Sequence, residues 1–313
     1  MKIDFDRAVR LLSEKDDFII LTHANPDGDT LGGGFALLAA LRSLGKKAKV
    51  VCGEALPEKY RFLEYPGDEI ENGFVVSVDV ADVQLLSSDV REKYADRIDL
   101  AIDHHATNRL FAKETYLEGD SASVCEVVFL LVKALGAKIG EEIATRLYTG
   151  CSTDTGCFRY SNVTPRTHRI AAELIEHGAR HSEVNVRMFE TKKPGFLKLQ
   201  SLCLSGMELH FGGKVSVFRI TRAMLFECSC GDEDCDALVA LSRQIEGVLV
   251  GVTFKEKADG SLKVSLRTHE GVDASQVCSA FGGGGHVRAA GCQFTCTFEE
   301  ARTQVLEELK KYI

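Results

Sequence analysis

The first half of the chain alternates short apolar runs with longer segments of helical periodicity. These segments predict buried strands at 18–22, 48–52, 74–80 and 100–103, and helices at 31–44, 121–135, 141–151 and 164–177. Strands that alternate with helices indicate a parallel sheet covered on both faces. The predicted fold class is therefore α/β, with a doubly wound, mostly parallel sheet. Such sheets bind ligands beyond the carboxyl ends of their strands.

The pattern breaks at Lys192-Lys193-Pro194-Gly195, which is typical of a linker. We predict a first domain at 1–190, a linker at 191–200 and a second domain at 201–313. Later segments predict strands at 214–220, 248–255 and 261–267, helices at 236–245 and 298–312, and a hairpin turn at 258–260. The second domain is therefore expected to be a smaller mixed α/β domain, with the active site in the cleft between the domains.

Composition narrows the class of protein. The chain has 313 residues, 45% of them hydrophobic, and only 5 prolines, which excludes a disordered chain. Its charge, 38 − 46 = −8, argues against coating long duplex nucleic acid. No apolar run reaches membrane-spanning length, and the N-terminus lacks the apolar core of a signal peptide. We expect a cytoplasmic protein with no membrane partner, whose 11 cysteines are reduced thiols.

Potential metal ligands follow the predicted strands of the first domain. The clusters are His23-Ala24-Asn25-Pro26-Asp27-Gly28-Asp29, Asp79-Val80-Ala81-Asp82, Asp103-His104-His105 and, at the end of a helical segment, Thr153-Asp154-Thr155-Gly156. Any one of them alone is more often a solvated loop or a helix cap. Together they bring many carboxylates to one edge of the sheet, where burial without counter-cations is costly. Two divalent ions resolve this repulsion, and mixed carboxylate and imidazole ligands suit Mn²⁺, with Mg²⁺ or Co²⁺ as substitutes.

Two glycine-rich segments and one cysteine cluster need interpretation. Gly282-Gly283-Gly284-Gly285-His286 predicts an anion-binding loop with a histidine donor, followed by a helix start. Gly32-Gly33-Gly34 lacks the lysine of a P-loop, so we interpret it as close packing of the first helix. The cysteines Cys228, Cys230 and Cys235 have no fourth zinc ligand at short range, which favours a variable loop over a zinc site.

These motifs resemble the DHH phosphoesterase family, which is named after the tripeptide Asp103-His104-His105. The resemblance also covers the segments 23–29, 78–79, 103–108 and 153–156, together with the glycine-rich motif of the DHH-associated C-terminal domain. It therefore spans nearly the whole chain in the order of the family. In its length and in the residues of its motifs, the chain most resembles the nanoRNase/pAp-phosphatase branch of the family. Proteins of this branch hydrolyse very short oligoribonucleotides and 3′-phosphoadenosine 5′-phosphate (pAp).

The resemblance implies a role for each residue that matches a motif. One Mn²⁺ would be held by His23, Asp27 and Asp79, and the other by Asp29, Asp79, His104 and Asp154. Asp103 would orient a ligand histidine, and His105 would face the phosphate. Substrate would be bound from the second domain by Arg267, Gly283, Gly284, Gly285 and His286, with Asn108 and Arg159 as further substrate-side candidates. Water activated by the two ions would attack phosphorus in line, and His105 would stabilise the charge or protonate the leaving oxygen.

Several related activities stay open at this point. A cyclic-dinucleotide (c-di-AMP) phosphodiesterase would use the same catalytic domain. A family II inorganic pyrophosphatase has similar length, but the segment 282–291 argues against it, and we find no Ser-Arg-Lys-Lys-Gln run. A RecJ-type single-strand exonuclease is typically longer. A binding module without catalysis would normally have lost metal ligands. The resemblance allows a homodimer through the catalytic domain, although no residue shows it.

Overall fold

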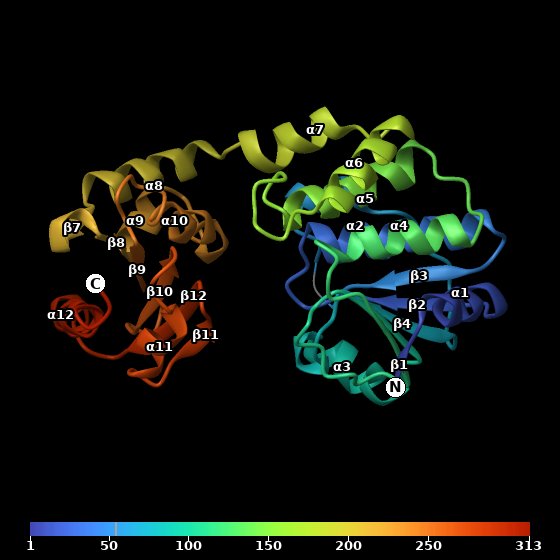
Figure 1. Cartoon of the computed structure of the whole chain (residues 1–313), viewed down its shortest axis with the longest axis horizontal. Helices are drawn as coiled ribbons and strands as arrows, with labels where there is room; N and C mark the ends of the chain where they lie inside the picture. The colour runs from blue at the N-terminus through green and yellow to red at the C-terminus, as the bar shows by residue number, and fades with distance from the viewer. Residues whose placement is uncertain (54) are drawn as a thin grey trace. The chain divides into compact units, whose positions relative to one another are not determined.

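The computed structural model describes residues 1–53 and 55–313, which form two compact units, Met1–Thr191 and Lys192–Ile313 (Figure 1). Within these residues, no helix combines the length and the apolar character needed to cross a membrane. The chain enters the second unit through α8 (Pro194–Ser205), so part of the segment expected to be a linker is helical.

The first unit is built on a six-stranded sheet in which every pair of neighbours is parallel. In spatial order its strands are β1 (Lys2–Ile3), β6 (Glu114–Leu117), β5 (Leu100–Asp103), β4 (Phe74–Val78), β2 (Phe18–Leu21) and β3 (Ala48–Val51). The helices are α1 (Phe5–Glu14), α2 (Gly28–Ser43), α3 (Ser88–Tyr94), α4 (Val124–Ala134), α5 (Glu141–Asp154), α6 (Pro165–Glu176) and α7 (His181–Asn185). Short helical turns are η1 (Glu58–Leu63), η2 (Val83–Leu85), η3 (Ala95–Arg97) and η4 (Val186–Glu190). The predicted parallel α/β sheet is confirmed.

Side chains on both faces of this sheet are buried, as expected for a parallel sheet covered on two sides. Phe18 and Ile20 of β2 pack with α1, α2, α4 and α5 on one face. Ile19 and Leu21 alternate with them and pack on the other face with Val90 of α3 (Figure 1). The sheet is thus enclosed, and its carboxyl edge is where polar side chains gather.

The glycines of α2 explain how this helix lies so close to its neighbours. A Cβ on Gly32 would be 2.4 Å from the Arg146 carbonyl oxygen of α5, and a Cβ on Gly33 would be 3.1 Å from side chains of Val78 and Val124. The interpretation of this glycine run as close packing is therefore confirmed for Gly32 and Gly33, whereas a Cβ on Gly34 would be 3.4 Å from its nearest neighbour. The helix begins at Gly28, earlier than the predicted Leu31, because the Asp27 side chain caps it.

The second unit contains a mixed six-stranded sheet. Its strands in spatial order are β11 (Gly284–His286), β12 (Ala289–Phe294), β10 (Leu262–Thr268), β9 (Val250–Glu256), β8 (Val215–Ile220) and β7 (Glu208–His210). Only the β8–β9 pair is parallel among the pairs described. The other elements are α9 (Arg222–Glu227), α10 (Asp236–Leu241), α11 (Ala274–Ser279), α12 (Phe298–Leu309), η5 (Phe211–Gly213) and η6 (Asp232–Asp234).

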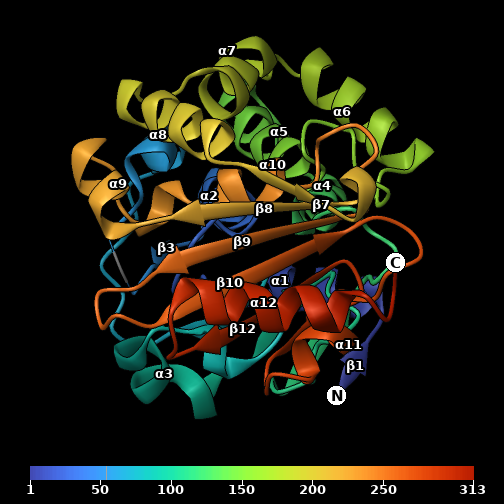
Figure 2. The same cartoon turned by 90° about the vertical axis from the view of Figure 1, so that its left-hand side faces the viewer.

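The two faces of this second sheet carry different residues. Val264 and Leu266 of β10 pack in one apolar cluster with residues of α11 and α12, and α12 lies along this face (Figure 2). Phe218 of β8 belongs to another cluster with residues of α8, α9 and α10. The expected helix start after the glycine-rich loop was wrong: β12 follows, antiparallel to β11 and β10, because its residues pair with both strands.

Candidate metal centre

Histidine and aspartate side chains converge at the carboxyl edge of the parallel sheet. Three overlapping groups have ligand atoms within 4.8 Å of one another. They are His23 with Asp27 and Asp79, Asp29 with His104 and Asp154, and Asp79 with His104 and His105. All predicted metal ligands are thus brought together at the edge where β2, β4 and β5 end.

The first group is built where β2 gives way to α2. The Asp27 carboxylate accepts backbone hydrogen bonds from Asp29 N (2.9 Å) and Thr30 N (3.1 Å), so it is the N-cap of α2. His23 Nε2 lies 3.7 Å from Asp27 Oδ1 and 3.9 Å from Asp79 Oδ2. Asp27 therefore caps a helix and also faces a cluster of potential ligands.

The second group surrounds His104, which directly follows β5. His104 Nε2 lies 3.7 Å from both Asp29 Oδ2 and Asp154 Oδ2. Asp29 is buried in the first turn of α2, and Asp154 is the last residue of α5. Two helices, α2 and α5, thus place carboxylate oxygens beside the imidazole that follows β5.

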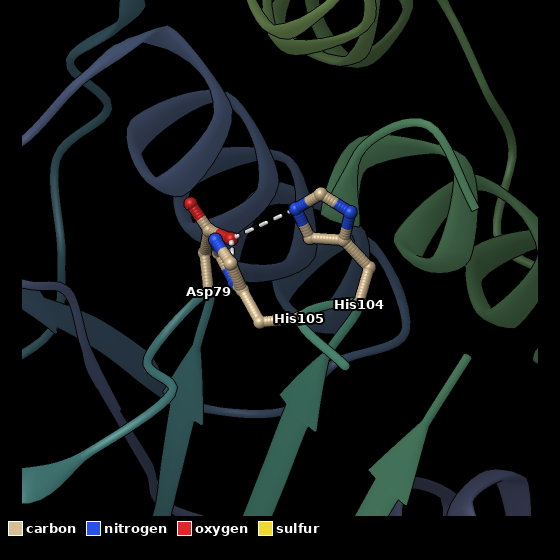
Figure 3. A group of neighbouring side chains, drawn as sticks. All are labelled: Asp79, His104 and His105. Atoms are coloured by element: carbon tan, nitrogen blue, oxygen red, sulfur yellow. Dashed lines mark ion pairs between the residues drawn. The ribbon is translucent and has the colours of Figure 1, made fainter. Parts of the chain in front are cut away.

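Asp79 connects the two groups. Its Oδ2 faces His23, while its Oδ1 lies 3.5 Å from His104 Nε2 and 3.5 Å from His105 Nδ1 (Figure 3). Oδ1 is buried and has no hydrogen-bond partner among the described residues. The backbone of Asp79 has φ 64°, a left-handed conformation that costs a residue other than glycine about 1–3 kcal/mol. Strain and an unsatisfied buried oxygen meet at the position that a bridging ligand would occupy.

The pKa values in this cluster reflect crowded negative charge. Burial, followed by the charges of Asp79 and Asp154, raises the pKa of Asp29 well above its usual range. Burial also raises the pKa of Asp154 to about 6. Burial opposes protonation of His104, but its close contact with Asp79 and the charges of Asp29, Asp79 and Asp154 raise its pKa to about 10. When no cation is bound, protons therefore neutralise part of the negative charge of the aspartates in this cluster.

The donor set fits divalent cations. Its ligand atoms are carboxylate oxygens and imidazole nitrogens, the combination that suits Mn²⁺ and related ions, and no cysteine belongs to these groups. The unsatisfied Asp79 Oδ1 is an orphan acceptor for which a cation is a suitable partner. The histidine and aspartate clusters thus have the composition and proximity of metal sites.

Asp103 holds His105 in place. Asp103 Oδ1 accepts from His105 Nδ1 (2.8 Å), and its Oδ2 accepts from Asn108 Nδ2 (2.6 Å). The hydrogen bond to Asp103 is the main cause that raises the pKa of His105. Asp103 is fully buried, whereas 44% of the His105 side chain is exposed. The Asn108 amide also donates to the Val80 carbonyl, so it supports Asp103 from within the loop.

The segment Ser121–Cys125 orients two of the predicted ligands, and sequence reasoning missed it. The Ser121 carbonyl accepts from His104 Nδ1 (3.0 Å), which leaves Nε2 facing the carboxylates. The backbone amides of Val124 and Cys125 donate to Asp29 at 2.6 Å and 3.0 Å. These contacts join residues far apart in the chain, so no local motif reveals them.

Arg166 of α6 fixes this segment from the other side. Its guanidinium donates to Ser121 Oγ (2.5 Å), Glu126 Oε2 (3.3 Å) and Glu118 Oε1 (3.5 Å). Glu126 is fully buried, so its carboxylate depends on this partner. A glutamate inside the apolar run that begins at Val124 was the available signal for a buried ion pair.

The remaining substrate-side candidates lie elsewhere in the chain. Arg159 is exposed and follows Asp154 closely, and its Nε donates to the Gly156 carbonyl. In the second unit, Arg267 on β10 is paired with Ala289, and Ala289 with His286 of β11. Gly283 precedes β11, and Gly284 and Gly285 belong to it.

The cysteine cluster forms no group of metal ligands among residues 1–53 and 55–313. Cys228 and Cys235 are buried in an apolar cluster with residues such as Leu238, and Cys230 is packed against it. Burial raises the pKa of Cys235 to about 11, so this thiol stays protonated at neutral pH. The expectation of a loop before a helix agrees with α10, which begins directly after Cys235; the short turn η6 lies between Cys230 and Cys235.

Known proteins are similar to this chain in sequence. The family model described as "DHH family, N-terminal domain" matches residues 17–151, and the model of the DHHA1 domain matches residues 223–313. A bifunctional oligoribonuclease and PAP phosphatase of Thermus thermophilus is 35% identical over 300 residues, with 93% of this chain and 89% of that protein covered. A protein of Bacillus subtilis with the same description is 27% identical over 292 residues, covering 90% and 91%.

A solved structure supports the same relationship at the level of fold. An exopolyphosphatase-related protein from Bacteroides fragilis superimposes with a TM-score of 0.88 at 24% identity, covering 98% of this chain and 95% of that chain. The same family assignment is supported by the parallel sheet, by the ligand groups at its carboxyl edge and by the sequence matches. This chain therefore belongs to the DHH family of phosphoesterases.

Proposed function

We propose that this protein hydrolyses phosphoester bonds in small nucleotides, namely short oligoribonucleotides, dinucleotides and pAp, with two Mn²⁺ ions. The observation that carries the proposal is the Asp79 carboxylate, whose two oxygens face two different ligand groups. The relatives from Thermus thermophilus and Bacillus subtilis, described as oligoribonucleases and PAP phosphatases, support this choice of substrate.

The proposed ligand sets follow the geometry of the cluster. His23, Asp27 and Asp79 would hold one ion, and the other would be held by Asp29, Asp79, His104 and Asp154. Bound divalent ions supply Lewis acidity, which lowers the pKa of a coordinated water and offsets charge on the phosphoryl oxygens. Asp79 would tie both sets together, because its Oδ2 faces His23 and its Oδ1 faces His104.

His105 is the proposed proton donor. The Asp103 carboxylate accepts from Nδ1, so Nε2 is the ring nitrogen left for the substrate. The raised pKa of His105 favours a proton on Nε2 that can pass to the leaving oxygen. Asp103 acts through His105 as a positioning residue, and Asn108 in turn positions Asp103.

The second unit is proposed to bind substrate phosphate. Arg267 and His286 share one face of the mixed sheet, because paired residues of neighbouring strands project to the same side. The backbone at Gly283–Gly285 allows close approach of an anion, since these residues carry no side chain. Arg159 remains a candidate contact on the first unit.

A substrate panel with product analysis tests the proposal. Mn²⁺-loaded protein is assayed on a dinucleotide, pAp, c-di-AMP, its linear product, a 24-mer and pyrophosphate. We expect the dinucleotide and pAp to be hydrolysed and pyrophosphate to be left intact. Asp79→Asn should abolish turnover, whereas Asp82→Asn, a nearby aspartate paired with Arg109, should retain it. Hydrolysis of pyrophosphate or of c-di-AMP alone would refute the proposed substrate class.

A further inference from the structure

The second unit has a pocket at the glycine-rich loop, and the proposed function uses only Gly283 and Gly284 of its lining. It is lined by three lysines, Lys255, Lys257 and Lys263, and by a single acidic side chain, Asp232. The rest of the lining is Gly282, Gly283, Gly284, Gly291, Cys292 and Gln293. Glycine backbone next to three cationic side chains is a setting suited to an anion.

The charges in this pocket are unbalanced. Lys255 and Lys263 are directly paired across β9 and β10, and like charges in such positions repel. Asp232 Oδ1 lies 2.9 Å from Lys255 Nζ and 3.6 Å from Arg222 Nη1. The hydrogen bond and charge of Lys255, with the charges of Arg222 and Lys263, lower the pKa of Asp232. One carboxylate thus serves several cations, and an added anion would relieve the repulsion.

The strand register connects this pocket to the proposed phosphate-binding residues. Lys263 and Arg267 are four residues apart on β10, so their side chains project from the same face, about 13 Å apart at about 3.3 Å per residue. Val264 and Leu266 project from the opposite face into the apolar core. The pocket itself includes Gly284, two residues before His286 on β11.

We propose that Lys255, Lys257 and Lys263 bind a backbone phosphate of an oligonucleotide whose terminal phosphate lies at Arg267 and His286. This inference rests on the proposed function and extends it. A stacked strand rises about 3.4 Å per nucleotide along its axis, and the winding of the backbone adds to the distance between phosphates, so 13 Å corresponds to fewer than about four nucleotides. The two phosphates of pAp belong to one nucleotide and cannot reach both places.

The pocket therefore provides length selectivity. An oligonucleotide of about five residues would gain contacts from the lysines that pAp and a dinucleotide do not reach. The recognised chemistry is the phosphodiester backbone, because the lining offers cations and backbone amides and no aromatic side chain for stacking a base. Binding should depend on salt more than on base sequence.

The test compares charge-matched variants of the Mn²⁺-loaded protein. Lys255→Gln/Lys263→Gln removes two charges from the pocket, and Lys310→Gln/Lys311→Gln removes two from the end of α12. Affinity for a phosphorothioate pentaribonucleotide is measured by fluorescence anisotropy across a salt series, beside kcat/KM for pAp. We expect the pocket variant to bind the pentanucleotide about tenfold more weakly, with a salt slope shallower by about 0.7–1.4, and the control to match wild type. Asp232→Asn should strengthen this binding.

Unchanged pentanucleotide affinity in the pocket variant would overturn the inference, as would an equal loss of kcat/KM for pAp. These results differ from failure of the proposed function. If wild type hydrolysed neither pAp nor dinucleotides but the pentanucleotide still bound through the lysines, the pocket would stand and the proposed activity would fall.

Discussion

Gly150 of α5 lies where the structure leaves no room for even one methyl group. A Cβ there would be 2.2 Å from Cys125 Sγ and 2.5 Å from Asp29 Oδ1, and both residues are buried. Gly150→Ala must therefore push the Asp29 carboxylate away from the backbone amides of Val124 and Cys125. The substitution thus tests packing and ligand geometry at once.

The expected change in the free energy of unfolding follows from two effects that lower it and one that raises it. Overpacking a buried site costs about 1–3 kcal/mol, and a lost hydrogen bond to a charged group costs about 1.5–3 kcal/mol. Replacing a helical glycine with alanine returns about 1 kcal/mol. We expect Gly150→Ala to lower the free energy of unfolding by about 2–4 kcal/mol and to weaken Mn²⁺ binding at least about tenfold, as for other changes behind a metal ligand.

Gly34→Ala is the matched control. A Cβ on Gly34 of α2 would be 3.4 Å from Thr22 Cγ2, an ordinary contact, so this variant should gain up to about 1 kcal/mol. Urea unfolding of both variants and Mn²⁺ titration followed by electron paramagnetic resonance provide the two measurements. If Gly150→Ala unfolded and bound Mn²⁺ like wild type, the inferred packing of α5 on Asp29 would be wrong.

Three further outcomes follow from the same contacts. Arg166→Ala should lower the free energy of unfolding in urea by about 3–5 kcal/mol, because buried Glu126 loses its partner. The control Arg169→Ala, on the same helix, should stay within about 0.5 kcal/mol of wild type. His105→Gln should lower kcat on pAp about 10²–10⁴-fold while Mn²⁺ affinity changes little, and a parallel loss of affinity would contradict a proton-transfer role. When Mn²⁺ is present at about 100 times its Kd, removing it with a chelator should lower the free energy of unfolding by about 2.7 kcal/mol. Hydrogen exchange should show this loss in residues 1–191 and no loss in residues 192–313.

The ligand cluster was predictable because its ligands lie near strands and helices that the hydrophobic pattern of the sequence predicts. The apolar runs that become β2, β4 and β5 are short and buried except for Phe74 at the start of β4, and parallel pairing brings their carboxyl ends to one edge. His23, Asp79 and His104 follow these ends within two residues. Local pattern and sheet geometry together were therefore enough to place them side by side.

Elements defined by long-range pairing were not predictable in this way. The segment 289–294 contains small residues without clear periodicity, and it becomes β12 because β10 and β11 pair with it. Arg166 meets its partners 40 to 48 residues away, so its role has no local signature. By contrast, α1 was left out although Asp4 is a good N-cap and caps it in the structure.

Asp79 shows why this site favours function over the stability of the bare fold. Its backbone is held at φ 64°, its Oδ1 is buried without a hydrogen bond, and other carboxylates crowd the same few ångströms. Each feature alone is a cost that a sequence selected only for stability would remove, for instance with glycine at this position. Under the proposed function, cations held by the two ligand groups would offset the carboxylate charges and give Asp79 Oδ1 a partner. The left-handed turn keeps the carboxylate between them, so the strain fixes the ligand geometry before any ion binds.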